Sequence, residues 1–448
     1  MLLRATFKNI LSFHEEVQIS FVAGKSSTLP EHVCRAEKRD DISVLKSGII
    51  YGANASGKSN VIHCINTLQS FARDVLPKHH VSPFKLISRN TESSKIEVEF
   101  KHAATYYAYG IEFDVHGLRE EWLYEIGSRK ENKIFTRIVS ANGNSFDFGT
   151  VSGDSKTHQL LTFIAHGTPA NNSFLSEYIK RNGVGLDQVR EAMNWFRRLN
   201  IIFPGTKYRS IAVDAEKDAA FRTATRELLQ FFNTGIVDIR RVKVAREEIG
   251  ISQEIVENLI ENAIPGYSCI ISDASANTMF TIDFNNDGTM TFYKHVTVHR
   301  ADDGTEVIFE LAEESDGSIR LLDFIPMLID LRINDPIYLI DEIDRSMHPM
   351  LSAKILEFYN SHILCDLDDV EYMPHESQLI FTTHESNLLD LKQIRADEVW
   401  FVEKDVNGAS HLTSLSEYKP REDVRKGYLL GRYGAIPFFA PIKKLNWR

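Results

Sequence analysis

Apolar and polar positions follow one another along the chain in a pattern that predicts a mixed α/β fold. Residues 47–51 form a short apolar run, and residues 59–71 carry apolar side chains at helical spacing on one side. Two later apolar runs, 337–340 and 379–381, are continuous, which is typical of strands buried on both faces of a parallel sheet. Within 96–113 the pattern alternates instead and predicts strands of an antiparallel sheet.

Helical periodicity dominates a long middle part of the chain, from about 157 to 232. Its aromatic residues, among them Trp195 and Phe196, fall on apolar faces, so we expect them to form core and not a surface for stacking bases. The chain then returns through two hairpins with turns at 286–288 and 303–304. We therefore predict three parts, which are the first half of an α/β head (1–130), an inserted, mostly helical lobe (131–278) and the second half of the head (279–448).

A glycine-rich loop between the first strand and its helix fits the phosphate-binding pattern G-x-x-x-x-G-K-[ST]. The backbone N–H groups of such a loop and the N-terminus of the helix cradle phosphates. We expect Lys58 to reach the β- and γ-phosphates of ATP and Ser59 to bind Mg²⁺. The predicted nucleotide-binding residues of the loop are Gly52, Asn54, Ser56, Gly57, Lys58, Ser59 and Asn60.

A second half of the same site is predicted where the apolar strand 337–340 runs into paired carboxylates. Asp341 is expected to hold Mg²⁺, and Glu342 to orient or deprotonate the attacking water. The alternative, an acidic loop, is disfavoured because a buried parallel strand delivers its carboxyl end to the ligand crevice. Asp341 follows Lys58 by 283 positions, so a large insertion must leave the nucleotide-binding domain and return to it.

Two further segments carry candidate chemistry. The predicted strand that begins at Gln378 ends in Thr383 and His384. We expect His384 to sense the γ-phosphate, although a lone histidine is also a common structural residue. Ser315 and Gly317 form a small polar turn directly before a predicted helix, and Ser315 is in the simplest interpretation a helix N-cap. The turn lies about one helix and one loop ahead of Asp341.

The chain resembles the ABC-type ATPases of the chromosome-maintenance (SMC), RecF and OLD group, and in particular the AAA-type proteins of bacterial anti-phage operons, including RloA-type proteins. The opening segment 2–21, the segment DEIDRSMHP at 341–349 and the ending GRYGAIPFF at 431–439 carry this resemblance. It implies a P-loop NTPase with an ABC-type head, built of a mixed sheet and an antiparallel β lobe, with an inserted helical lobe.

The resemblance also implies roles for individual residues. Ser315 and Gly317 match the serine and glycine of the usual LSGGQ signature, and His384 matches the switch histidine. A signature of this kind completes the ATP site of a partner subunit, which implies a head-to-tail homodimer, or a higher oligomer built from dimers, with ATP and Mg²⁺ at the seam. No clear Q-loop glutamine is present, although the segment 81–87 occupies a plausible place for it.

Composition narrows the class of protein. Four cysteines are scattered without metal-ligand spacing, and neither a signal peptide nor a run of ~18 apolar residues is evident, so we expect a cytoplasmic protein without a membrane span. A net charge of −11 argues against a surface that coats nucleic acid. The basic run 239–246 is expected to be a solvated strand face, with contact to DNA or a partner as the alternative.

These features predict an ATPase that acts as a sensor or scaffold. OLD-type relatives carry a TOPRIM nuclease after the ATPase, and the residues that follow His384 are too few for one. We therefore expect the ATPase to control a separately encoded effector, a toxin or a nuclease, in anti-phage defence. Two alternatives remain open, namely a RecF-like DNA repair ATPase that binds DNA through its dimer groove and a nucleotide-gated antitoxin.

Overall fold

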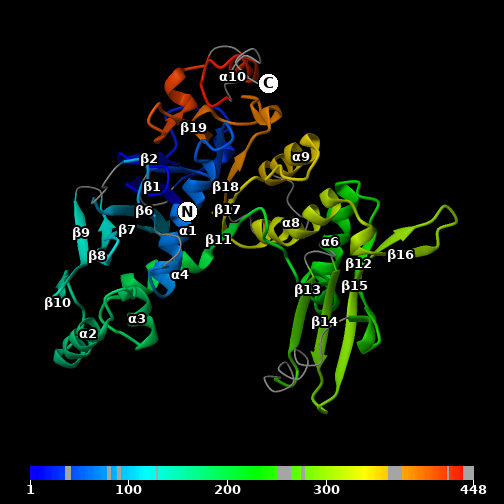
Figure 1. Ribbon diagram of the computed structural model, residues 1–448, viewed down its shortest axis with the longest axis horizontal. Coiled ribbons are helices and arrows are strands. Elements are labelled where there is room, and N and C mark those ends of the chain that lie inside the picture. The colour runs from blue at the N-terminus through cyan, green and yellow to red at the C-terminus, as the bar shows by residue number, and fades with distance from the viewer. Residues whose placement is uncertain are drawn as a thin grey trace, which may run out of the picture. The chain divides into compact units, whose positions relative to one another are not determined.

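The structure, a computed structural model, describes residues 1–35, 42–77, 82–87, 92–127, 130–249, 264–273, 278–361, 376–420 and 423–436. The chain forms two compact units, each assembled from separate segments (Figure 1). Unit 1 comprises Met1–Pro204, Asn334–Asp344 and Asn360–Arg448, and unit 2 comprises Gly205–Ile333 and Arg345–Tyr359. The chain thus leaves unit 1 once for a long excursion and once for a short one.

A six-stranded sheet forms the centre of unit 1. Its strand order is β11-β17-β18-β5-β19-β20, and all neighbours are parallel except the last pair. The strands are β5 (Ser47–Gly52), β11 (Leu199–Ile202), β17 (Ile337–Ile340), β18 (Gln378–Thr383), β19 (Val399–Lys404) and β20 (Ser410–Ser414). Because β5 lies between β18 and β19, the sheet cannot form until distant parts of the chain have met.

Helix α1 (Lys58–Arg73) follows β5 and packs with α3 (Phe174–Lys180) and α4 (Asp187–Arg198). Its buried face includes Val61, Ile62, Ile65 and Leu68, as the apolar spacing predicts. The buried amide of Gln69 donates hydrogen bonds to the carbonyls of Phe196 (2.9 Å) and Leu199 (2.6 Å). These bonds satisfy two carbonyls where α4 ends and β11 begins.

A seven-stranded antiparallel sheet forms the second layer of unit 1, in the order β10-β9-β8-β7-β6-β1-β2. A buried ion pair joins two of its strands, with Arg137 Nη1 3.1 Å from Glu121 Oε2. The strands are β1 (Leu2–Lys8), β2 (Val17–Ser20), β6 (Ser94–His102), β7 (Thr105–Asp114), β8 (Gly117–Ile126), β9 (Glu131–Ser140) and β10 (Gly143–Phe148); a small sheet pairs β3 (Val33–Arg35) with β4 (Ser43–Leu45).

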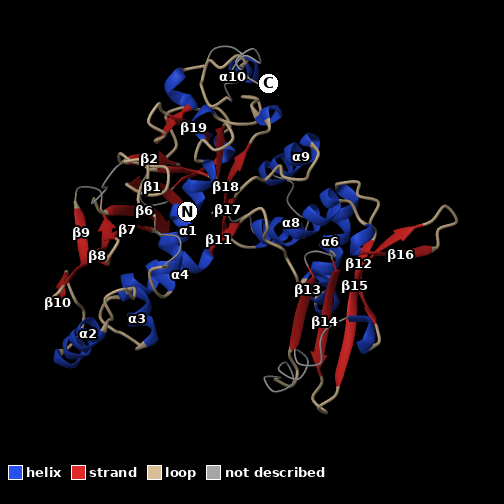
Figure 2. Ribbon diagram, in the orientation of Figure 1, coloured by secondary structure: helices blue, strands red, loops and turns tan. Residues whose placement is uncertain are grey.

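Unit 2 combines helices with a five-stranded antiparallel sheet. In Figure 2, β13, β14 and β15 run side by side, and the β15–β16 hairpin extends from them. The strands are β12 (Asp238–Lys243), β13 (Ser268–Asp273), β14 (Thr278–Phe284), β15 (Met290–Arg300) and β16 (Glu306–Glu310), and the helices are α5 (Ile211–Lys217), α6 (Ala219–Phe231), α8 (Asp316–Ile333) and α9 (Pro349–Asn360).

The region in which the sequence predicts an inserted lobe, 131–278, contains both kinds of element. Residues 131–148 form β9 and β10, and in the antiparallel sheet of unit 1 β9 pairs with β8 and β10 pairs with β9. Helix α2 (Ser155–Gly167) comes next, and four further helices lead to Phe231, in agreement with the helical periodicity. The two hairpin turns lie between β14 and β15 and between β15 and β16, where the glycine-containing turns predict them.

Helix α10 (Val424–Leu429) follows the central sheet near the end of unit 1. No helix in the described ranges is both long and apolar enough to cross a membrane. The last residues of the segment 431–439, which carries part of the family resemblance, lie outside the described residues.

Candidate nucleotide-binding site

The glycine-rich loop of unit 1 is shaped by close approaches that leave no room for larger residues. Gly57 is the N-cap of α1 with φ +112°, a left-handed conformation that favours glycine. A Cβ atom added there would lie 2.4 Å from Ser410 Oγ and 2.6 Å from Ser12 Oγ. At Gly52 an added Cβ would lie 2.4 Å from Ser56 Oγ. The motif glycines are therefore required by the packing of the loop.

Lys58 is folded back over its own loop. Its ammonium group donates to the carbonyls of Gly52 (2.8 Å) and Ala53 (3.1 Å). Burial lowers the pKa of Lys58 from its ordinary value to about 8, and the nearby carboxylates of Asp341 and Glu342 oppose this shift. The side chain is thus a poorly solvated cation, for which a phosphate would be a better partner than two carbonyls.

The rest of the loop also fits a phosphate group. Ser56 Oγ is buried and, within the described part of the chain, has no hydrogen-bond partner. The backbone carbonyl of Ser56 accepts a 2.6 Å hydrogen bond from Ser410 Oγ, which fixes the loop against β20. Asn54 is exposed at the tip of the loop. A phosphate bound in this loop would supply the missing partner of the Ser56 hydroxyl.

The two predicted halves of the magnesium site meet directly. Ser59 Oγ donates to Asp341 Oδ1 at 2.9 Å, although 282 positions separate the two residues. Asp341 is buried, and its backbone N–H donates to Ile202 O on the neighbouring strand. A hydroxyl and a carboxylate are hard oxygen ligands of the kind that Mg²⁺ prefers, and Mg²⁺ keeps several waters when few protein ligands are present.

Thr382, which no sequence motif marks, links the side chain of Asp341 to the backbone of Glu342. Its hydroxyl donates to Asp341 Oδ1 at 2.7 Å and accepts a 2.7 Å hydrogen bond from the backbone N–H of Glu342. Glu342 has a left-handed backbone with φ +52°, an unfavourable conformation for this residue type. The hydrogen bond to Thr382 holds Glu342 in that conformation, and such strain is found at functional sites.

His384 lies at the end of β18, close to the loop and the carboxylates. Its backbone N–H donates to Asp344 Oδ2 at 3.3 Å. Although His384 is exposed, partial desolvation and then the charge of Lys58 lower the pKa of the imidazole below its ordinary value, which favours the neutral ring. Asp344 Oδ1 is buried and lacks a hydrogen-bond partner within the described ranges. Asp344 could have been identified from the sequence, because it is a third carboxylate close to Asp341 and Glu342.

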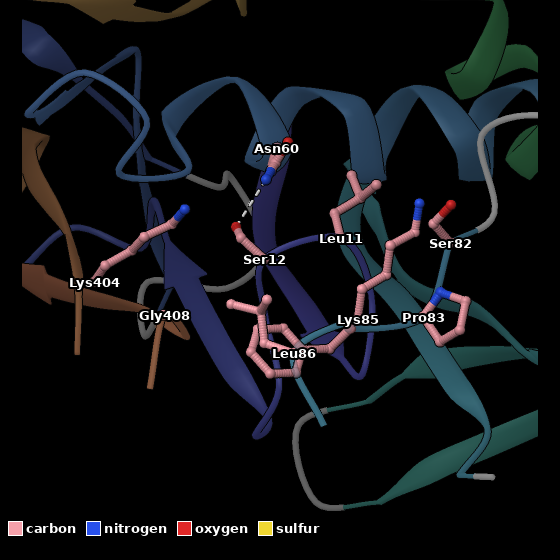
Figure 3. A pocket seen from close by; sticks show the side chains of 10 residues that line it. Leu11, Ser12, Asn60, Ser82, Pro83, Lys85, Leu86, Lys404 and Gly408 are labelled. Carbon is pink, nitrogen blue, oxygen red and sulfur yellow. Dashed lines mark hydrogen bonds between the residues drawn. The ribbon is translucent and has the colours of Figure 1, made fainter. Parts of the chain in front are cut away.

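Asn60 is one of the residues that line a cavity of about 340 Å³ in unit 1 (Figure 3). Its amide donates to Ser12 Oγ at 2.8 Å. The segment 82–86 forms another wall, held to the β1–β2 connection by a 2.8 Å hydrogen bond from Leu11 N to Ser82 O. The lining residues are Leu11, Ser12, Asn60, Ser82, Pro83, Phe84, Lys85, Leu86, Lys404 and Gly408.

The turn at Ser315 belongs to unit 2, whereas the loop and the carboxylates belong to unit 1. Ser315 Oγ accepts a 3.1 Å hydrogen bond from Ser318 N and so caps α8. A Cβ added to Gly317 would lie 3.0 Å from the carbonyl oxygen of Ser346. The N-cap interpretation of Ser315 is therefore correct, and it leaves a role toward nucleotide untested.

The chain is similar to one described family over most of its length. A family model described as "AAA domain, putative AbiEii toxin, Type IV TA system" matches residues 49–390. The chain belongs to this family. The match covers the glycine-rich loop, the paired carboxylates and His384. Ser12 and Ser410, and the cavity residues Leu11, Lys404 and Gly408, lie outside the matched residues.

No curated protein matches the sequence. Among solved structures, the AAA domain is similar to the SMC head domain from Thermotoga maritima, with 13% sequence identity and a TM-score of 0.41. That alignment covers 92% of this chain and 98% of the other.

Proposed function

We propose that this AAA domain binds and hydrolyses ATP with Mg²⁺, and that its nucleotide state controls a separately encoded effector in anti-phage defence. The observation that carries the ATPase assignment is the hydrogen bond from Ser59 to Asp341, because it places the last residue of the phosphate loop against the first carboxylate after β17. The family description supports a link to a toxin.

Each residue of the site has a role in this proposal. Lys58 leaves the carbonyls of its own loop and pairs with the β- and γ-phosphates. Ser59 and Asp341 would hold Mg²⁺, which when bound neutralises charge on the phosphates. Glu342 orients the attacking water and accepts its proton, and Thr382 keeps Glu342 in place. Neutral His384 contacts the γ-phosphate as a hydrogen-bond donor.

The remaining parts of the proposal rest on the resemblance to ABC-type ATPases of anti-phage operons. Two copies would associate head to tail, and Ser315 and Gly317 of one copy would complete the ATP site of the other. The cavity beside Asn60 would receive the nucleoside half of the nucleotide, because it continues from the start of α1. A RecF-like ATPase and a nucleotide-gated antitoxin are the alternative functions.

The test uses two variants of the full chain, Lys58→Ala and Glu342→Gln. Lys58→Ala should abolish stable ATP binding, because the phosphates lose their central cation. Glu342→Gln should bind ATP normally and lower the turnover rate by about 10²-fold or more, because the water loses its base. Calorimetry with Mg-ATP and a phosphate-release assay measure the two effects.

Affinity purification of the Glu342→Gln protein from its native host then tests the effector. A protein that co-purifies with the ATP-trapped variant, and is absent from the Lys58→Ala preparation, supports control of an effector. Co-purified nucleic acid without such a protein supports the RecF-like alternative instead. Unchanged ATP affinity in Lys58→Ala would refute the assignment of the phosphate loop.

A further inference from the structure

A buried carboxylate lies immediately before the turn that carries Ser315 and Gly317. The side chain of Glu314 is 6% exposed. Its Oε1 atom accepts hydrogen bonds from Thr297 Oγ1 at 2.5 Å and from His299 Nε2 at 2.6 Å. Both donors lie on β15, and all three residues belong to unit 2. The chain is therefore attached to the sheet one residue before the turn.

The donors on β15 are themselves held firmly. This strand pairs with β12, β14 and β16, so it lies inside the five-stranded sheet. Thr297 is fully buried, and the ring of His299 packs against Phe309 with 4.4 Å between centroids. If the turn moved, Thr297 and His299 would stay in the sheet and their hydrogen bonds to Glu314 would break.

The turn beyond Glu314 is equally constrained on its other side. Ser315 caps α8 through Ser318 N, and Gly317 approaches the carbonyl of Ser346 so closely that a Cβ would be only 3.0 Å away. A buried carboxylate is costly without its donors, so a displaced turn would leave the charge of Glu314 unpaired. The position of the turn relative to β15 is thus narrowly determined.

We infer that Glu314 is a positioning residue, which fixes the Ser315–Gly317 turn against β15 so that the turn can complete the ATP site of a second copy of this chain. The inference rests on the proposed function, in which Ser315 and Gly317 contact nucleotide bound by the partner. Glu314 itself touches no nucleotide in this scheme. Glu314 acts by fixing the position of the turn. Because Glu314 is hydrogen-bonded to β15, the sheet of unit 2 influences the rate of ATP turnover through this strand.

Glu314→Gln removes the charge while keeping the size of the side chain. We expect ATP affinity to stay at the wild-type value, since the phosphate loop is untouched, and the turnover rate to fall by about 10- to 100-fold, as is usual when a contacting group is slightly misplaced. Thr297→Val, which removes one donor at almost constant volume, should lower the turnover rate in the same direction. Glu313→Gln is the matched control, because Glu313 is the adjacent exposed carboxylate.

Mixing variants separates positioning of the turn from general damage to the subunit. Lys58→Ala protein has an intact turn and a defective phosphate loop, whereas Glu314→Gln protein has the reverse. In a head-to-tail dimer of the two, one site combines the intact loop with the intact turn. We therefore expect ATP hydrolysis to reappear on mixing. Lys58→Ala mixed with Ser315→Ala is the positive control.

Each outcome is decisive. Restored hydrolysis with both mixtures supports the inference. Restoration with Ser315→Ala but not with Glu314→Gln overturns it, as does wild-type turnover in both Glu314→Gln and Thr297→Val. If neither mixture regains activity while the wild type hydrolyses ATP, the head-to-tail arrangement of the proposed function is wrong, and the inference falls with it. If Glu314→Gln does not fold, Thr297→Val replaces it in the mixture.

Discussion

At the scale of single residues, Lys58 shows how a binding site can be poised for a ligand. Its buried ammonium group donates to two carbonyls of its own loop, and burial lowers its pKa to about 8. At neutral pH, burial of the protonated Lys58 side chain therefore lowers the free energy of unfolding, compared with a lysine exposed to water. A phosphate group would remove this penalty, because it supplies the missing negative charge.

Lys58→Met should consequently abolish ATP binding without lowering the stability of the ligand-free protein at pH 7. The folded pKa of about 8 lies below the ordinary 10.5, so between these pH values the unfolded chain binds more protons and the charge penalty shrinks as pH rises. At pH 7 the penalty is at most about 3 kcal/mol, offset in part by the two hydrogen bonds.

Urea denaturation of the wild type and Lys58→Met from pH 7 to pH 10 measures this effect as a difference between the two proteins. The advantage of Lys58→Met should be greatest at pH 7 and should decline toward pH 10. A variant that is less stable than the wild type by the same amount at every pH would show that the cation is well accommodated and that the expectation is wrong.

At the scale of elements, β15 organises unit 2. One part of the strand presents Thr297 and His299 to Glu314, and another buries His295 in the sheet. His295 Nε2 lies 2.6 Å from Thr281 Oγ1. Burial, with the nearby charge of Arg241, lowers the pKa of His295 to about 4, against the opposing charges of Asp283 and Glu216.

Unit 2 should therefore lose stability in mild acid. Between pH 6.5 and about 4 the unfolded chain binds a proton at His295 that the folded sheet does not, so the free energy of unfolding falls as the pH falls. The full loss is up to about 3 kcal/mol. His295→Gln should remove this part of the pH dependence. Hydrogen exchange of β12, β14 and β15 at pH 7 and pH 5 measures it, and equal acid sensitivity in both proteins would contradict the prediction.

A second cluster in unit 2 decides how the basic run 239–246 is to be understood. The carboxylate of Asp238 receives Arg222, Arg226 and Arg240 at 2.7 to 2.8 Å. Although burial opposes it, hydrogen bonding from these arginines holds the pKa of Asp238 well below its usual range. Arg240 also pairs with Glu306.

Arg241 is likewise occupied, because it pairs with Glu216 and Asp283 and lies over the ring of Tyr293. Two of the four cations of the run are thus neutralised within unit 2 and serve its packing. The sequence predicted a solvated strand face for this run. That prediction is wrong for Arg241, whose side chain is only 4% exposed.

At the scale of the whole molecule, these pairings bear on the DNA-binding alternative. The chain carries a net charge of −11, and two arginines of its basic run, Arg240 and Arg241, are paired with carboxylates. Binding to duplex DNA depends on cations that are free to replace counterions on phosphates. We therefore expect no binding of a ~30 bp duplex at about 150 mM salt, with or without Mg-ATP.

Fluorescence anisotropy of a labelled duplex over a range of salt concentrations checks this prediction, with Glu342→Gln included so that the ATP-bound state is sampled. Submicromolar binding that weakens steeply with salt and stimulates ATP hydrolysis would favour the RecF-like function. Absence of binding in both proteins leaves an effector protein as the expected partner.

The sequence by itself determined the local chemistry of this protein. The glycine-rich loop between β5 and α1, the carboxylates after β17 and the histidine after β18 could be predicted because each is a contiguous motif next to an apolar strand. The apolar spacing of α1 and the hairpins of unit 2 were predictable for the same reason. Local patterns specify local structure without knowledge of the partner strands.

Only the tertiary structure decided which residues meet. Thr382 joins Asp341 to Glu342, and Ser12 and Ser410 enclose Gly57, although no motif marks these hydroxyl groups. Residues 131–148 joined the antiparallel sheet instead of opening a helical lobe, since strand pairing depends on an edge that β8 provides. Such contacts join positions far apart in the chain, and the physical cause is the order of strands in the sheet, which a one-dimensional pattern does not contain.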